Sequence, residues 1–226
     1  MSIVSRREFL TRLALGTGAL TIPSLIAGAC SDAITNPTEK ATLDLSSDPG
    51  VLNYFYTISQ LQTDFWNRVQ LNRFPGITTA ENTAVNLIQS HATQQRNWLS
   101  VYQTVGRVTD VLTFDFSSSV NFAQRASTMA AGVTIEDSAT QAYAGGLRYL
   151  NSPDNILLAA KLGSIAARHS ATLRDLNDIA AGGAPRTSFA GDDAVNASGL
   201  EIARTPSEVI ATLQKYFRTS LTVQNA

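Results

Sequence analysis

Cysteine and histidine are scarce in this chain: its 226 residues include one cysteine, Cys30, and two histidines, His91 and His169. A single cysteine excludes an internal disulfide. With so few histidines and thiols, neither a cysteine-based nor a serine-based catalytic triad has an obvious assembly. No Gly-x-Ser-x-Gly turn appears either, so the sequence gives no support for a hydrolase.

Excess positive charge is also absent. The chain has 17 basic and 18 acidic residues, and removing residues 1–29, which hold three arginines and one glutamate, leaves 14 and 17. No basic cluster with interleaved aromatic residues occurs, so the surface offers nothing to capture a phosphate backbone. We therefore expect no nucleic-acid partner.

The first thirty residues have the layout of an export signal. A basic front is followed by an apolar run over 13–29 and by small residues before Cys30. The paired arginines and the Phe-Leu that follows them resemble a twin-arginine signal, which implies folding before export; these residues are Ser5, Arg6, Arg7, Phe9 and Leu10. A plain membrane anchor is the alternative, but three glycines and a proline interrupt the run, which barely reaches the roughly 20 residues of a spanning helix.

Residues 25–30, Leu-Ile-Ala-Gly-Ala-Cys, resemble the cleavage box of bacterial lipoproteins, although Ala27 stands where leucine is usual. The resemblance implies that Cys30 is acylated and becomes the mature N-terminus. The product would then be a membrane-anchored lipoprotein of the periplasm or cell envelope. A soluble product cut near Ala29, with Cys30 as an ordinary thiol, is the other reading.

After Cys30, residues 30–47 are polar and small and predict a flexible tether. Apolar residues at helical spacing then predict four long helices over 48–74, 78–105, 122–150 and 153–181, and a last helix over 206–221. Asp48-Pro49 and the Thr78/Glu81 pair are helix-start signals. The prediction is one all-α domain over 48–226, a four-helix bundle of up-and-down or ferritin-like type with an additional C-terminal helix.

Four polar residues interrupt the apolar faces of these helices. They are Gln62, Gln95, Glu136 and His169. Burying an unpaired polar group costs about 1–3 kcal/mol, and burying a charge costs more. We therefore expect these side chains to meet in a polar network within the core.

Several segments together resemble the exported ferritin-like family that includes the desiccation-related proteins. The resemblance covers roughly 48–176 and is carried by residues 52–54, 61–66, 91–96, 135–137, 142–145 and 166–169. In that family the corresponding acids and histidines form a two-metal pocket. This chain has instead Ser59 and Gln62, Ala92 and Gln95, and Ala166 at five of those positions.

Only Glu136 and His169 remain from the family's ligand set. A two-metal carboxylate site needs about four acids and two histidines, so the expected core is metal-free, with no cofactor. The alternative is one metal ion, zinc or iron, bound by Glu136 and His169 with help from His91 or Asp64.

Two functional hypotheses follow. The first is a non-enzymatic ferritin-like protein of the cell envelope with a structural, stress-associated or interaction role and a degenerate metal site. The second is an oxidase or metal store that uses iron, manganese or zinc with a reduced ligand set, and twin-arginine export motivates it. The protein partner and the pairing of the bundle with itself stay open.

Overall fold

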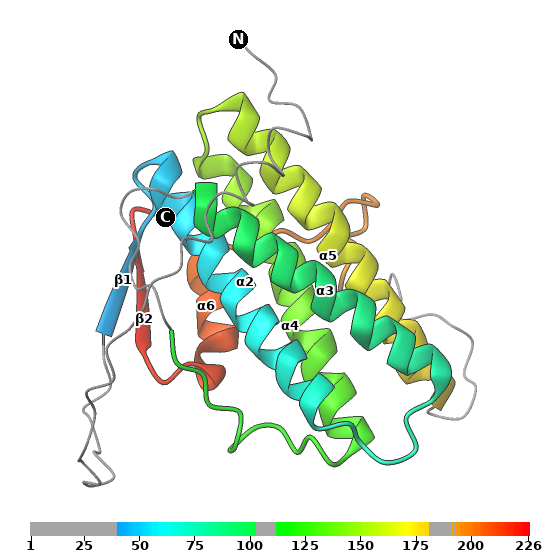
Figure 1. Cartoon of the computed structure of the whole chain (residues 1–226). Coiled ribbons are helices and arrows are strands. Elements are labelled where there is room, and N and C mark those ends of the chain that lie inside the picture. The colour runs from blue at the N-terminus through cyan, green and yellow to red at the C-terminus, as the bar shows by residue number, and fades with distance from the viewer. Residues whose placement is uncertain (1–39, 103–111, 181–190, 192) are drawn as a thin grey trace, which may run out of the picture. The chain divides into compact units, whose positions relative to one another are not determined.

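A computed structural model describes residues 40–102, 112–180, 191 and 193–226. Four long helices run side by side: α2 (Asp48–Leu71), α3 (Thr79–Tyr102), α4 (Arg125–Gly146) and α5 (Pro153–Ala180) (Figure 1). A 3-10 turn, η1 (Leu147–Tyr149), joins α4 to α5. The all-α helical bundle predicted from the apolar periodicity is confirmed.

α2 is the central helix, because it packs against both α3 and α4 and nearly all of its residues between Val51 and Val69 are buried. Its start differs from the expected one. Ser47 occupies the N-cap position without a side-chain hydrogen bond. The Asp48 carboxylate instead accepts hydrogen bonds from the backbone of Asn151 and Ser152 and from the Asn155 amide, and so fastens the start of α5 to α2.

The start of α3 follows the expected capping box. The Thr78 backbone N–H donates to Glu81 at 2.8 Å, and the Glu81 backbone N–H donates to the Thr78 hydroxyl at 3.2 Å. Arg125, at the start of α4, donates to Glu81 at 2.5 Å and to the Leu176 carbonyl of α5 at 2.8 Å. Through Arg125, one partly buried ion pair and one hydrogen bond thus join the ends of three helices.

The C-terminal region departs from the single helix expected over 206–221. Helix α6 (Pro206–Leu213) has a reciprocal capping box formed by Thr205 and Glu208, and it packs against α4. A 3-10 turn, η2 (Gln214–Tyr216), ends the helix, and strand β2 (Ser220–Gln224) follows. The two adjacent β-branched residues of β2, Thr222 and Val223, favour this extended conformation.

Strand β2 pairs in parallel with β1 (Lys40–Asp44), in a register that matches Lys40 with Ser220 and Asp44 with Gln224. Alternate β1 residues are buried, and Leu43 is fully buried. β1 lies within residues 30–47, for which a tether was expected. The ordered domain therefore begins earlier, by residue 40.

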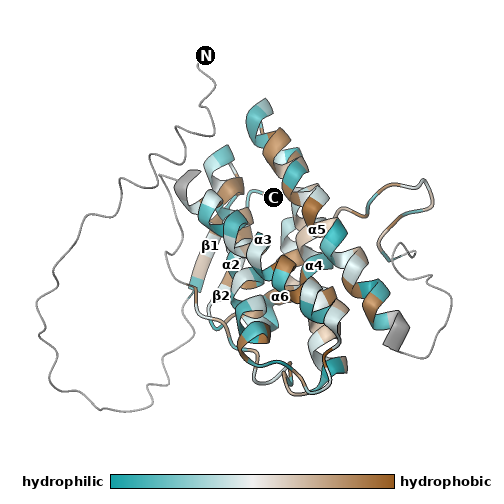
Figure 2. Ribbon diagram, turned by 45° about the vertical axis from the view of Figure 1, so that its right-hand side comes forward, coloured by the Kyte–Doolittle hydropathy of each residue, from teal (hydrophilic) through white to brown (hydrophobic). Residues whose placement is uncertain are grey.

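The hydropathy of the described helices changes repeatedly along their length (Figure 2). Among the residues described, no helix combines the length and apolar character needed to cross a membrane. The expected export signal, with Ser5, Arg6, Arg7, Phe9, Leu10 and Cys30, lies outside the described residues.

Candidate functional site

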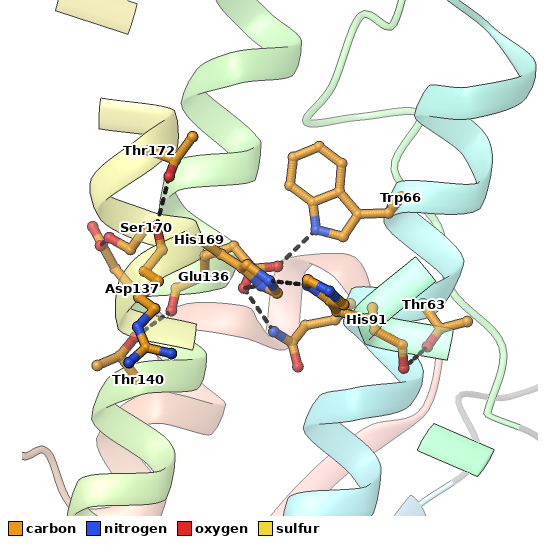
Figure 3. Close-up of polar contacts among 12 residues, drawn as sticks. Thr63, Trp66, His91, Glu136, Asp137, Thr140, His169, Ser170 and Thr172 are labelled. Carbon is orange, nitrogen blue, oxygen red and sulfur yellow. Dashed lines mark hydrogen bonds and ion pairs between the residues drawn. The ribbon is translucent and has the colours of Figure 1, made fainter. Parts of the chain in front are cut away.

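Glu136 of α4 is the centre of a polar cluster inside the bundle. Its side chain is fully buried, and its Oε1 atom accepts a 2.7 Å hydrogen bond from the Trp66 indole N–H. Its Oε2 atom accepts from Gln62 Nε2 at 2.9 Å and lies 3.2 Å from His169 Nδ1 (Figure 3). Gln62 and Trp66 are one turn apart on α2, so both reach the same carboxylate. The carboxylate is solvated by protein N–H groups instead of water.

Tyr143 extends the cluster along α4. Its hydroxyl donates to Gln62 Oε1 at 3.3 Å, and this fixes the amide with its nitrogen toward Glu136. Burial, and secondarily the negative charge of Glu136, raises the pKa of the Tyr143 hydroxyl. The phenol therefore stays protonated and acts as a donor.

Gly132 provides the space in which the Trp66 indole lies. A Cβ atom at Gly132 would lie 2.8 Å from Trp66 Cη2, closer than side-chain contacts allow. Gly132 precedes Glu136 by one helical turn, so the missing side chain lets the indole pass over α4 and reach the carboxylate. Any other residue at position 132 would displace the Trp66 ring.

His169 carries the cluster from α4 to α5 and α3. Its ring is 7% exposed, and its Nε2 atom lies 3.0 Å from Nδ1 of His91 on α3. The two rings are within 6° of parallel and their centroids are 5.3 Å apart. The distance between the ring centroids exceeds the distance between the two nitrogens by about two ring radii. The two rings therefore lie edge to edge in one plane, and the hydrogen bond between them is linear.

The tautomers follow from this line of contacts. With Glu136 ionised, His169 donates from Nδ1 and accepts at Nε2, so neutral His91 donates from Nδ1. The Nε2 atom of His91 makes no hydrogen bond to another described residue. It is also not one of the fully buried atoms without a partner, so it reaches solvent. Burial, and then the electrostatic interaction with His169, lowers the pKa of His91.

The donor set does not fit a two-metal centre. Three N–H groups already bond the Glu136 carboxylate, and the facing nitrogens of His169 and His91 lie 3.0 Å apart and point at each other rather than at a common metal position. Within the described residues, no group of three or more His, Cys, Asp or Glu side chains could hold a metal ion. The three side chains instead form a hydrogen-bonded line from Glu136 through His169 to His91.

Of the four residues expected in the core network, the structure brings together Gln62, Glu136 and His169. Gln95 does not join them: it is half-buried on α3, and no hydrogen bond links it to this cluster in the described part of the chain. Asp64 is not near the cluster either, because it faces away on α2 and binds Arg68 at 2.7 Å. His91, named above with Asp64 as a helper ligand for a single metal ion, contacts His169 directly.

Trp66 and Tyr143 are aromatic residues of the core. Both are fully buried, and each also supplies the hydrogen of a core hydrogen bond. Their spacing carries the signal that sequence reasoning missed. Trp66 follows Gln62 by four residues and Tyr143 follows Glu136 by seven, so each polar aromatic shares a helix face with a polar core residue.

A separate ion-pair network lies beside the cluster. Asp137, next to Glu136, binds Arg174 of α5, and Arg174 binds Asp193 at 2.8 Å. Burial alone would lower the pKa of Arg174, but the hydrogen bonds that it donates to Asp193 and Asp137 raise the pKa well above its usual range. Arg174 is thus a permanent cation that fastens the residue 193 segment to the bundle.

Comparison with known families agrees with the helical architecture. A family model described as a ferritin-like domain matches residues 47–178, more than half of the chain and nearly the whole span from α2 to α5. No curated protein matches the chain. The Glu136 cluster lies inside the matched segment, on helices α2, α3, α4 and α5. The chain belongs to the ferritin-like domain family.

Proposed function

We propose that this protein is a ferritin-like module of the cell envelope, anchored by a lipid on Cys30, that works without a dinuclear metal centre. Its role is structural, stress-associated or interactive rather than catalytic. The membrane is its expected partner, through the anchor.

The observation that carries the proposal is the set of hydrogen bonds to Glu136. Three N–H groups, from Trp66, Gln62 and His169, occupy three of the about four lone-pair sites that a bridging carboxylate would offer to metal ions. A hydrogen bond to a charged group contributes about 1.5–3 kcal/mol, so metal entry would have to offset the loss of several of them. The cluster serves as a packed polar core.

The anchor proposal is supported by the pattern of the first thirty residues and by the short distance along the chain to the domain. Nine residues separate Cys30 from Lys40, where β1 begins. Fully extended, that segment spans roughly 35 Å, so a lipid on Cys30 would keep the domain close to the bilayer surface.

The metalloprotein alternative has one observation in its favour: Glu136, His169 and His91 lie in consecutive contact. These contacts are in line rather than around a common centre. A metal ion would require His91 to rotate away from His169 and Glu136 to release its donors. That cost makes the metal-free reading the better supported one.

Elemental analysis decides between the two readings. The full chain would be purified after growth with added iron, manganese and zinc, and its bound metal quantified. The proposal expects less than about a tenth of an equivalent of each metal, since structural sites bind stoichiometrically. One or more equivalents that disappear in Glu136→Gln and persist in the surface variant Glu201→Gln would establish the metalloprotein instead.

Mass spectrometry of the mature N-terminus tests the anchor separately. The expected result is a peptide that begins at Cys30 and carries fatty acyl groups. A mature chain that begins at another residue, or an unmodified Cys30 thiol, would contradict the lipid anchor without affecting the metal result.

A further inference from the structure

A second polar site lies on the face of α2 opposite the Glu136 cluster. A pocket of about 190 Å³ is lined by polar α2 side chains that include Gln60, Asp64 and Asn67, by Arg96 of α3 and by Phe114. At 100° per residue, Gln60 and Asp64 point nearly opposite to Gln62 and Trp66. The pocket is therefore independent of the core network.

Gln60 gives the pocket an unused donor. The residue is only 7% exposed, and its Oε1 atom accepts from the Leu112 backbone N–H at 3.4 Å. Its Nε2 atom donates to no other described residue. The atom is not fully buried either, since it is absent from the set of buried atoms without a partner. This amide nitrogen therefore opens into the pocket, where a bound molecule can accept from it.

The other polar side chains also keep atoms available. Asp64 uses Oδ2 to bind Arg68, which leaves Oδ1 as an acceptor. The Asn67 oxygen accepts from Gln89, which leaves the Asn67 amide nitrogen as a donor. Arg96 donates only to the neighbouring Asn97 side chain at 3.0 Å, and in the described part of the chain no acid pairs with it.

The walls of the pocket are held in place by contacts that do not involve a ligand. Arg68 Nη2 donates to the Phe114 carbonyl at 3.3 Å. Phe114 forms an antiparallel bridge with Phe217, and the Arg218 backbone N–H donates to the Thr113 carbonyl at 3.1 Å. A ligand would thus meet a preformed surface, which lowers the entropic cost of binding.

The size and lining restrict the ligand. Drug-sized molecules occupy pockets of about 300–1,000 Å³, and one water takes about 30 Å³, so this pocket suits a molecule equivalent to several waters. A simple cation would face Arg96, a simple anion would face Asp64, and an apolar molecule would leave Gln60 unpaired. Hydroxyl groups donate and accept together, and the planar amide, carboxylate and guanidinium groups match adjacent hydroxyls.

We propose that this pocket binds a small polyhydroxylated molecule of monosaccharide size. Gln60, Asn67 and Arg96 donate to its hydroxyl oxygens, and Asp64 accepts from a hydroxyl. The Phe114 ring covers one apolar C–H face of the molecule. Because the pocket is small and open to water, the affinity is expected to be on the order of 1–10 mM in dissociation constant.

Saturation-transfer NMR on the full chain, in a detergent without a sugar headgroup, tests the proposal. The probes are glucose and myo-inositol, with glycine and acetate as a zwitterion and an anion of comparable polarity. Transfer to the two polyols at about 50 mM is expected, and the absence of transfer to either would overturn the proposal. Transfer to glycine or acetate in place of the polyols would overturn the assigned ligand class.

Variants locate the binding site. Gln60→Ala and Arg96→Ala should each weaken polyol binding by about tenfold, the usual effect of removing one hydrogen bond to an uncharged ligand. The matched control is Gln70→Ala, an exposed glutamine of the same helix, which should leave binding unchanged. Because Gln60 also holds Leu112, Arg96→Ala is decisive if Gln60→Ala fails to fold. Unchanged binding in a normally melting Arg96→Ala protein would refute the site.

Discussion

Replacing Glu136 with leucine tests the core network most directly. The substitution keeps an apolar side chain of similar size but leaves Trp66 Nε1, Gln62 Nε2 and His169 Nδ1 without their shared acceptor. Each of these three buried donors left unsatisfied costs about 1–3 kcal/mol, which is about 3–9 kcal/mol for the three if none of them relaxes. After relaxation of the freed side chains, we expect a loss of about 3–5 kcal/mol in the free energy of unfolding. That is a large part of the about 5–15 kcal/mol typical of a domain.

Urea denaturation followed by far-UV circular dichroism measures the effect. The midpoint should fall while the dependence on urea stays the same, because the surface exposed on unfolding is unchanged. Glu136→Gln, which keeps one acceptor oxygen, should lose less stability than Glu136→Leu. Glu201→Leu, at an exposed acid, serves as the matched control. A Glu136→Leu protein within about 0.5 kcal/mol of the wild type would refute the buried network, since surface changes have effects of that size.

Three further outcomes follow from the same structure. Gly132→Ala should displace the Trp66 indole and destabilise the protein by about 1–3 kcal/mol in urea denaturation, whereas Gly163→Ala, whose Cβ would have ordinary 3.4 Å contact, should be neutral or stabilising. Folding lowers the pKa of His91 from 6.5, so the unfolded chain binds a proton at this residue at a higher pH than the folded protein does. The stability advantage of the wild type over His91→Asn, measured by thermal melting, should therefore shrink as the pH falls below 6.5. A difference that does not depend on pH would contradict the lowered pKa. Deleting β2 should make β1 sensitive to protease, while deleting only the last two residues should not; equal cleavage of both proteins would show that the strand pairing is not protective.

The long helices were predictable because their apolar residues repeat at three- and four-residue spacing and their starts carry local signals. The Thr78/Glu81 capping box depends on residues only three positions apart, so the sequence contains the whole interaction. The strands were not predictable in the same way. β1 and β2 have five residues each, and their partners are 180 positions apart along the chain, so no local pattern reveals the pairing.

The candidate site was partly predictable for a related reason. Gln62, Glu136 and His169 interrupt apolar stripes, and burial cost alone requires that such groups find one another. Gln95 interrupts a stripe too, but a helix position does not say which neighbouring helix it faces. His91 faces α5 rather than α2, and only the packing of α3 against α5 shows this.

The parallel pairing of β1 and β2 has a mechanical consequence. Residues 40 and 224 lie at opposite ends of the little sheet, so a pull on the chain before residue 40 runs along the strands and loads all five residue pairs at once. Shear of this kind resists force better than opening the pairs one after another. The same polarity places the last residues at the Asp44 end of the sheet, so a fluorescent protein fused after Ala226 would be joined at the end opposite Lys40.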